Sequence, residues 1–225
     1  MPLVSRRSAA SDLFITIVFF LACDASIPLL NPVLRHGHGL GMAFAAAAYQ
    51  FTFEGVAPLL IMAFRRERFS AYGLNGRNAG KSLALALLLA VIYDIAMSWH
   101  AGALLWVPLR RQPAVRISLA AGFPLSLVGL AVTIAVWGFF EGFFGVFFAK
   151  KLNQALGHDG RGWLAPGALV FALFNALIHL GIGQGIEGFV FSLASGYAIA
   201  VIPAVTGNAW GSPLVQTLTN AVGKL

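Results

Sequence analysis

The sequence predicts an all-α polytopic membrane protein, a single transmembrane helical bundle over residues 1–225 with roughly six to seven membrane segments. Apolar residues make up 59% of the chain, its mean hydropathy is +0.81, and only 10% of its residues are charged. A soluble domain carries about 25% charged residues. The apolar residues also form runs close to the roughly 20 residues that a helix needs to cross a bilayer. No linker between these runs is long enough to separate domains.

The N-terminal half contains three apolar runs, and each predicts a helix. They cover residues 13–34, 42–64 and 82–105. Asn78 precedes the third run in a Gly/Asn-rich turn and is a candidate helix cap. Polar side chains inside these runs are expected to hydrogen-bond across helices at about 0.6 to 2 kcal/mol each. They are Asp24, Gln50, Glu54, Asp94 and His100, of which Gln50 and Glu54 share a helix face.

The C-terminal half contains four more runs. They cover residues 123–152, 163–181, 186–205 and 209–222. The first of these is longer than one span requires, so its helix must tilt, kink or protrude from the bilayer. The last is too short to span at 1.5 Å per residue and is expected to be a partial span packed on the others.

The net charge of +7 reflects membrane topology rather than nucleic-acid binding, because the basic residues lie between the apolar runs. Two Lys or Arg residues precede the first run, and the next four loops hold one, five, three and three. This alternation predicts a cytoplasmic N-terminus, with Lys150 and Lys151 at a cytoplasmic helix end. Arg6 and Arg7 precede a run without a clean cleavage site, so we expect a retained first helix. With no targeting segment evident, the expected location is a prokaryotic inner membrane.

One carboxylate lies in the most aromatic stretch of the chain, WGFFEGFFGVFFAKKL, residues 137–152. Six phenylalanines surround Glu141 there. A charged side chain in hydrocarbon usually faces a bundle interior and marks function. Two later helices each carry a polar pair at a spacing of four, which places both members on one face. These pairs are Asn175 with His179, and Gln216 with Asn220.

A carboxylate, an imidazole and carboxamides are the components of a site that activates water: a base, and donors for a developing oxyanion. They are equally the components of a structural hydrogen-bond network, and spacing alone leaves both interpretations open. The same holds for Gly138, Gly142 and Gly145, which let helices approach closely or leave room for a substrate.

Several stretches resemble the CAAX-protease and bacteriocin-processing family of intramembrane proteases. They are WGFFEGFFGVFFAKKL, FALFNALIHL, the basic loop YGLNGRNAGKSL, and SGYAIAVIPAVTGNAWGSPLVQTLTNAVG. The last is the most specific, since five residues fall in register with the family's third motif: Thr206, Gly207, Trp210, Pro213 and Asn220. Together these stretches cover about the C-terminal two thirds of the chain.

The resemblance implies an endopeptidase, similar to CAAX prenyl proteases, that cleaves a membrane-associated or lipid-modified peptide. It implies that Glu141 activates water, and that His179 and Asn220 stabilise the oxyanion or help to hold a metal. Gln216 takes the place of a family histidine in this site. Asn175 and Trp210 are candidate substrate contacts. The implied partners are membrane lipid and the peptide, with no nucleic acid.

The sequence also departs from the family pattern. The second glutamate of the family's Glu-Glu pair is Phe140 or Gly142 here, and the following arginine is Gly145 or Val146. Gln216 cannot be a general base and is a poor metal ligand. With one His and one Glu left, we expect no zinc and no other cofactor. These departures favour an alternative, a catalytically degenerate member that binds peptides or a partner, for example in immunity to peptide toxins.

Two other function classes use different residues. A haem-binding or small-solute protein would use His100 and His179 as axial ligands, although nothing in the sequence positions them as a pair. A transporter would use Asp24, Glu54 and Asp94 as a relay, but the inverted repeat typical of transporters is not visible.

Overall fold

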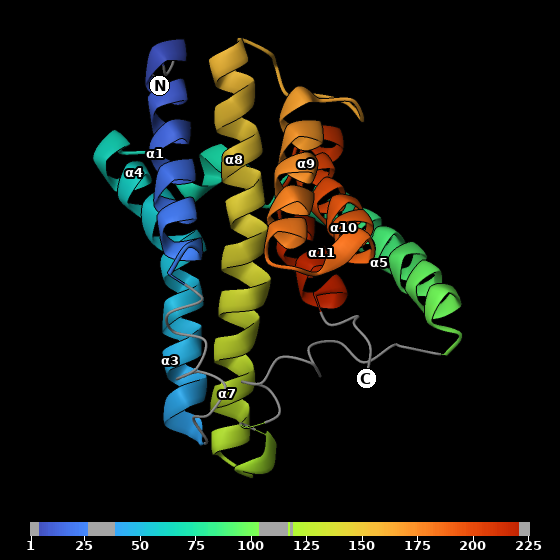
Figure 1. The fold of residues 1–225 in the computed structure, drawn as a ribbon. Coiled ribbons are helices and arrows are strands. Elements are labelled where there is room, and N and C mark those ends of the chain that lie inside the picture. Colours follow the sequence, from blue (N-terminus) through green and yellow to red (C-terminus); the bar gives the residue numbers. More distant parts are fainter. Residues whose placement is uncertain (1–4, 27–38, 104–116, 118, 221–225) are drawn as a thin grey trace.

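The structure, a computed structural model, describes residues 5–26, 39–103, 117 and 119–220, and the regular elements in these residues are all helical (Figure 1). The prediction of an all-α fold is therefore confirmed for this part of the chain. Four helices are long and apolar enough to cross a membrane: Leu40–Arg65, Ala79–Ala101, Leu125–Leu156 and Gly185–Thr206. The end of the first predicted run, the loop at 108–116 and the last residues of the seventh run lie outside the described residues.

In the N-terminal half, the second and third helical segments begin two or three residues before the predicted apolar runs, whereas the first helix begins at Arg6, seven residues before the predicted start. The second run forms one continuous helix, but its middle is a π-helical segment, η1. The elements are α1 (Arg6–Asp24), α3 (Leu40–Phe51), η1 (Thr52–Val56), α4 (Ala57–Arg65), the short 3-10 helix η2 (Phe69–Tyr72) and α5 (Ala79–Ala101).

The long fourth run is also one continuous helix, of 32 residues, and it too contains a π-helical segment, η3. Left-handed glycines end two of the helices in this half: Gly157 (φ 70°) follows α8 and Gly207 (φ 69°) follows α10. The elements are α7 (Leu125–Thr133), η3 (Ile134–Phe140), α8 (Glu141–Leu156), α9 (Pro166–Gly181), α10 (Gly185–Thr206) and α11 (Gly211–Thr219).

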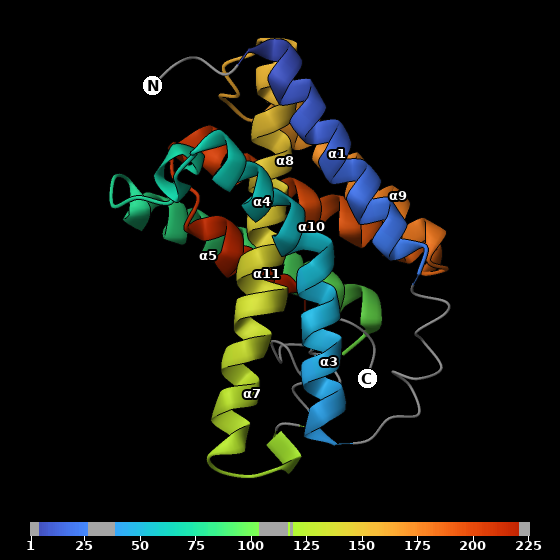
Figure 2. The same ribbon diagram turned by 90° about the vertical axis from the view of Figure 1, so that its left-hand side faces the viewer.

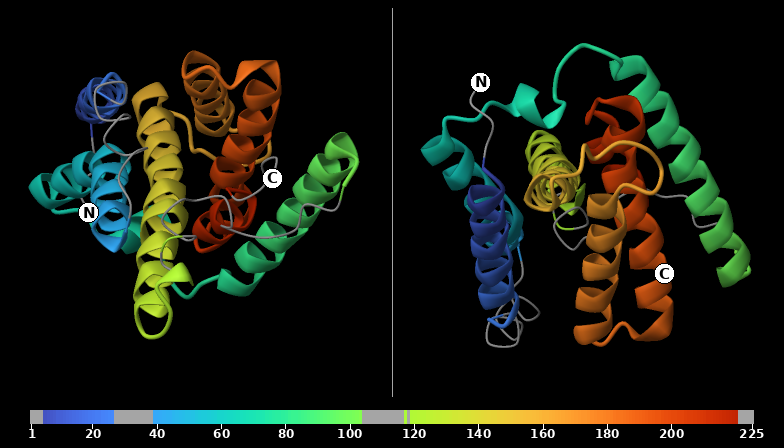
Figure 3. Two further views of the ribbon diagram at one scale, coloured as in Figure 1. Left: turned by 60° about the horizontal axis from the view of Figure 1, so that its bottom comes forward. Right: turned by 90° about the horizontal axis from the view of Figure 1, so that it is seen from above.

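Helix α8 lies at the centre of the bundle. Seen from above, α1 and α4 lie on one side of it, α9, α10 and α11 lie on the other, and α5 forms the far edge (Figure 3). The N-terminal end of α1 and the C-terminal end of α8 lie at the same end of the molecule (Figure 1). At the opposite end α3 and α7 run side by side and extend beyond the other helices (Figures 1 and 2).

The phenylalanines of α8 pack in two directions. Phe144 and Phe148 belong to the main core, whereas Phe143 and Phe147 pack on the other side against Tyr72. Two glycines let neighbouring helices approach α8 closely, as one of the sequence interpretations predicts. A Cβ on Gly142 would lie 2.8 Å from the Cα of Pro213 in α11, and one on Gly145 would lie 2.6 Å from the Phe171 ring in α9.

Lys151 is fully buried, although its position predicts a solvated cytoplasmic helix end. Its Nζ lies 2.9 Å from Asp12 Oδ2 on α1 and 2.9 Å from Glu67 Oε1. Arg65 contacts the other Asp12 oxygen at 2.8 Å. The Tyr72 hydroxyl donates a hydrogen bond to Glu67. Burial, together with this bond, raises the pKa of Tyr72, so the phenol remains a donor.

The link between α10 and α11 is tied to the loop before α5. The Asn208 side chain is fully buried and donates to the carbonyl oxygens of Asn75 (2.7 Å) and Arg77 (2.8 Å). Asn78 does not cap α5 with its side chain as predicted. Instead its Nδ2 donates to the Thr206 carbonyl at 2.9 Å, because this residue adopts a left-handed conformation. The two stretches of resemblance around residues 72–83 and 206–213 therefore form one junction.

Candidate functional site

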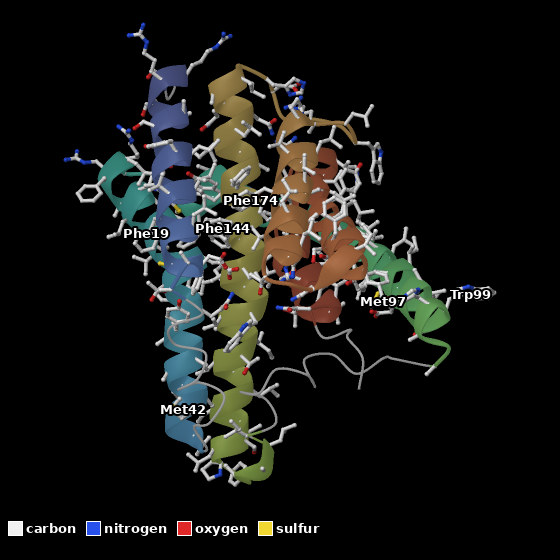
Figure 4. All side chains as sticks on the ribbon, viewed as in Figure 1. Phe19, Met42, Met97, Trp99, Phe144 and Phe174 are labelled. Carbon is white, nitrogen blue, oxygen red and sulfur yellow. The ribbon has the colours of Figure 1, made fainter. Side chains whose placement is uncertain are left out.

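A cavity of about 490 Å³ opens among the helices, with Glu141 on its wall. Its lining comes from α1, η1, α5, α8, α9, α10 and α11. Phe144 and Phe174 lie inside the bundle next to the cavity, whereas Trp99 at the end of α5 points away from it (Figure 4). Much of the wall is aromatic, with Phe20, Phe144, Phe171, Phe174 and Phe191.

Glu141 is held by two carboxamides from the α11 region. The Nδ2 of Asn220 donates to Glu141 Oε2 at 2.8 Å and to the Trp137 carbonyl at 3.1 Å. The Gln216 side chain also hydrogen-bonds to the Glu141 carboxyl. Gln216 and Asn220 can both reach it because α11 packs against η3 and α8, where Gly142 leaves room. The structure thus brings together three of the four predicted catalytic residues.

His179 and Asn175 line the same cavity but bond to other groups. Asn175 donates from Nδ2 to the Ser192 carbonyl on α10 at 2.8 Å. His179 Nδ1 lies 2.9 Å from Gln184 Oε1 at the start of α10, and the imidazole also interacts electrostatically with Asp24. The α9 pair therefore faces the cavity of Glu141, and the hydrogen bonds to the Glu141 carboxyl come from α11 and its C-terminal cap.

Trp210 lies outside the lining of this cavity. It is 41% exposed, and its ring centroid is 6.3 Å from that of Phe139. Thr206 and Gly207 lie in the junction with the loop before α5 rather than at the carboxylate. Of the residues that match the family's third motif, Asn220 is the one that reaches Glu141.

Glu54 on η1 also lines the cavity, although the sequence pattern did not indicate that it lies near Glu141. Its side chain is 6% exposed and hydrogen-bonds to Gln50, and its carboxyl is close enough to interact electrostatically with that of Glu141. Its Oε2 has no hydrogen-bond partner among the described residues. The sequence signal for Glu54 was a carboxylate within an apolar run. The spacing of residues along one helix does not show which other helix this carboxylate faces.

A histidine and a carboxyl from different helices approach each other at the edge of the cavity. His100 Nε2 on α5 is 3.3 Å from Glu187 Oε1 on α10, and both side chains are about half exposed. His100 and His179 both line the cavity, each with its own partner. Within the ranges that the structure describes, no three His, Cys, Asp or Glu side chains are grouped so as to hold a metal ion.

No protein-family model, no curated protein and no solved structure matches the chain. Its function is therefore inferred from the chemistry of this cavity.

Proposed function

We propose that the protein is an intramembrane endopeptidase, similar to the CAAX-protease and bacteriocin-processing family, that hydrolyses a peptide bond with water activated by Glu141. The observation that carries this proposal is the contact of Asn220 Nδ2 with Glu141 Oε2 at 2.8 Å in an aromatic cavity. A carboxylate that faces a cavity inside an apolar bundle can accept a proton from a bound water.

The carboxamides have two tasks in this mechanism. They fix the orientation of the Glu141 carboxyl, because each of Asn220 and Gln216 bonds to it. Their bonds to Glu141 also stabilise its negative charge before the carboxylate accepts a proton from water. Asn175 and His179 line the same cavity, and in this proposal they contact the peptide.

The substrate is a membrane-associated or lipid-modified peptide. Five phenylalanines line the cavity, which suits an apolar chain or side chain next to the scissile bond. We further propose that α1, α9 and α11 complete roughly six to seven membrane segments around the four long helices. The N-terminus is cytoplasmic, and the membrane is a prokaryotic inner membrane.

Two observations favour the alternative, a family member that binds a peptide or partner without cleaving it. His179 bonds to Gln184, and the Glu141 carboxyl bonds to Gln216 where the family has a histidine. A carboxamide donates hydrogen bonds but does not exchange protons. In this alternative Glu141 would recognise a donor group of the ligand.

The deciding experiment compares wild type with Glu141→Gln in liposomes, with a farnesylated CAAX peptide and a pool of membrane-anchored peptides as substrates. We expect the substitution to lower the cleavage rate by about 10²- to 10⁴-fold, the usual contribution of a general base. Asp94→Asn is the matched control, since Asp94 is a buried carboxylate that lies outside the cavity lining. Peptide binding by both proteins without cleavage by either would establish the binding alternative.

A further inference from the structure

We infer that Glu54 and Glu141 form a carboxyl pair that shares one proton, with Glu54 as the second acid-base group of the site. The two side chains come from different helices, η1 and α8, and meet in the same cavity. The catalytic step of this inference rests on the proposed function, whereas the carboxyl pair itself does not.

The burial and hydrogen bonding of Glu54 favour a functional role for its carboxyl over a structural one. The residue is 6% exposed, and its carboxyl has a hydrogen bond with the Gln50 side chain. One of its oxygens, Oε2, has no partner among the residues that the structure describes. Buried polar atoms are nearly always paired, so an unpaired carboxyl oxygen beside a cavity requires an explanation. A proton shared with a neighbouring carboxyl, or a hydrogen bond from a water or substrate group in the cavity, would pair this oxygen.

Both carboxyls are positioned by π-helical turns. Glu54 lies inside η1, and Glu141 follows directly after η3. The segment η1 contacts both η3 and α8. The rings of Phe51 and Phe140 pack edge to face there, with their centroids 4.7 Å apart. π-helical turns are rare and are frequent at functional sites. Two π-helical segments are in contact here, and each contains or precedes a carboxyl side chain. This arrangement favours a functional role for the contact between Glu54 and Glu141.

Two buried carboxyls that interact electrostatically do not both ionise readily, because like charges in a poorly solvated site repel. The surrounding donors are carboxamides: Gln50 at Glu54, and Gln216 with Asn220 at Glu141. Asn220 directs an N–H group at the carboxyl, which suits an oxygen that carries negative charge. The pair therefore holds one proton, on Glu54, and one negative charge, on Glu141.

The pair completes the hydrolysis without another acid. Glu141 takes a proton from water as the water oxygen bonds to the peptide carbonyl carbon. Glu54 then gives its proton to the peptide nitrogen as the C–N bond breaks. The products are a carboxylic acid and an amine, and the pair still holds one proton, now on Glu141. Transfer of that proton to Glu54 restores the starting state.

Other titratable groups face this cavity and contribute to any pH profile. They are Tyr93 and His100 from α5, His179 from α9, Glu187 from α10, and Asp24 next to His179. The Glu54–Glu141 coupling must therefore be separated from these groups by substitution.

The test is a carboxyl titration by infrared difference spectroscopy on the purified full chain in lipid nanodiscs, without substrate. The proteins are wild type, Glu54→Gln, Glu141→Gln and the double variant, with Asp94→Asn as a buried carboxyl outside the cavity. We expect two separated steps in wild type that the double variant lacks, and one step at an altered pH in each single variant. Asp94→Asn removes its own contribution and leaves both steps in place.

Independent titration overturns the pair: if Glu141 titrates at the same pH with and without Glu54, the two carboxyls do not share a proton. Coupling is reciprocal, so Glu141→Gln provides the same measurement if Glu54→Gln fails to fold.

The catalytic role is tested by cleavage. We expect Glu54→Gln to lower kcat by about 10²- to 10⁴-fold and to remove the alkaline limb of the pH profile, the limb set by the general acid. Cleavage with a wild-type rate and profile in Glu54→Gln overturns the role of Glu54 and leaves the peptidase intact. Coupled titration in a protein that cleaves nothing overturns the peptidase and leaves the pair.

Discussion

Single residues contribute strongly to both the stability and the chemistry of this bundle. Lys151 is an example of a residue that contributes to stability. An ammonium group with no exposed surface carries a large desolvation penalty, which its two carboxylate partners offset. The cluster joins α1, α8 and the loop after α4 through Asp12 and Glu67. Lys151 therefore connects elements that are far apart in the chain, in addition to placing a positive charge near a helix end.

Lys151→Met is expected to lower the free energy of unfolding by about 3 to 5 kcal/mol, because Asp12 and Glu67 lose their shared partner in a buried site. Lys81→Met is the control, since Lys81 lies on the surface at the start of α5 and should change stability by less than about 0.5 kcal/mol. Denaturant unfolding in mild detergent measures both. Equal effects of the two substitutions would contradict a stabilising role for the buried cluster.

Two asparagines should separate chemistry from stability. Asn220→Leu removes the N–H group that bonds to Glu141 and to Trp137, so peptide cleavage should fall by about 10²- to 10³-fold, as when one oriented donor is lost. Asn208→Leu removes donors to Asn75 and Arg77 and should cost about 1 to 3 kcal/mol of stability per buried group left unpaired. Its cleavage rate per folded molecule should stay at the wild-type value. The reverse pattern in rate and stability would contradict this division.

At the scale of elements, close helix packing brings the polar groups together. Helix α11 carries Gln216 and approaches α8 at Gly142, where an added Cβ would meet the Pro213 backbone at 2.8 Å. Any side chain at this position must push α11 outward. The position of Gln216 and Asn220 relative to Glu141 thus depends on a residue with no functional group.

Gly142→Ala is therefore expected to destabilise the fold by about 1 to 3 kcal/mol, the usual cost of overpacking, and to lower cleavage by displacing the carboxamides. Gly41→Ala is the matched control, because nothing lies within 4 Å of a Cβ built there on the exposed side of α3. It should stabilise α3 by up to about 1 kcal/mol through helix propensity. Thermal unfolding and cleavage rates in the same detergent test both. A Gly142→Ala protein as stable and active as wild type would show that α11 can shift freely.

The elements themselves could be predicted from sequence to a useful extent. Apolar runs identified the helices, and a spacing of four placed Gln216 and Asn220 on one helix face. In the structure both side chains bond to the Glu141 carboxyl. The π-helical turns could not be predicted, because the segments Thr52–Val56 and Ile134–Phe140 have the same apolar character as the α-helices that continue them. The meeting of Glu54 with Glu141 depends on tertiary packing, which a pattern along one helix does not contain.

At the scale of the whole molecule, the 32-residue helix from α7 to α8 sets the height of the bundle. At 1.5 Å per residue it is about 48 Å long, against a hydrocarbon thickness of about 30 Å. The end of the molecule where α3 and α7 run side by side is therefore expected to project from the bilayer unless these helices tilt (Figure 2). The cavity lies beside the middle of this helix, since Glu141 is near its centre.

This arrangement predicts opposite sidedness for the two ends of the long helix. In a Cys23→Ala background, a cysteine at Phe123 (83% exposed) should react with a membrane-impermeant maleimide in intact cells. A cysteine at Asp159 (66% exposed) should react only after permeabilisation, as should one at Arg7. Labelling of the first two positions from the same side would show that this helix does not cross the membrane.

The π-helical turns also make the length of the chain a functional variable. A π-helical turn holds more residues than the α-helical turn it replaces. Loss of Thr52 or Phe53 would let α3 run on into α4 as a regular helix of nearly the same span. The side chains around the deletion would turn by about 100° relative to one flank, since an α-helix has 3.6 residues per turn. Such a protein is expected to keep its helices with Glu54 turned away from Glu141, so the deletion of a single residue should separate the two carboxyls without removing either.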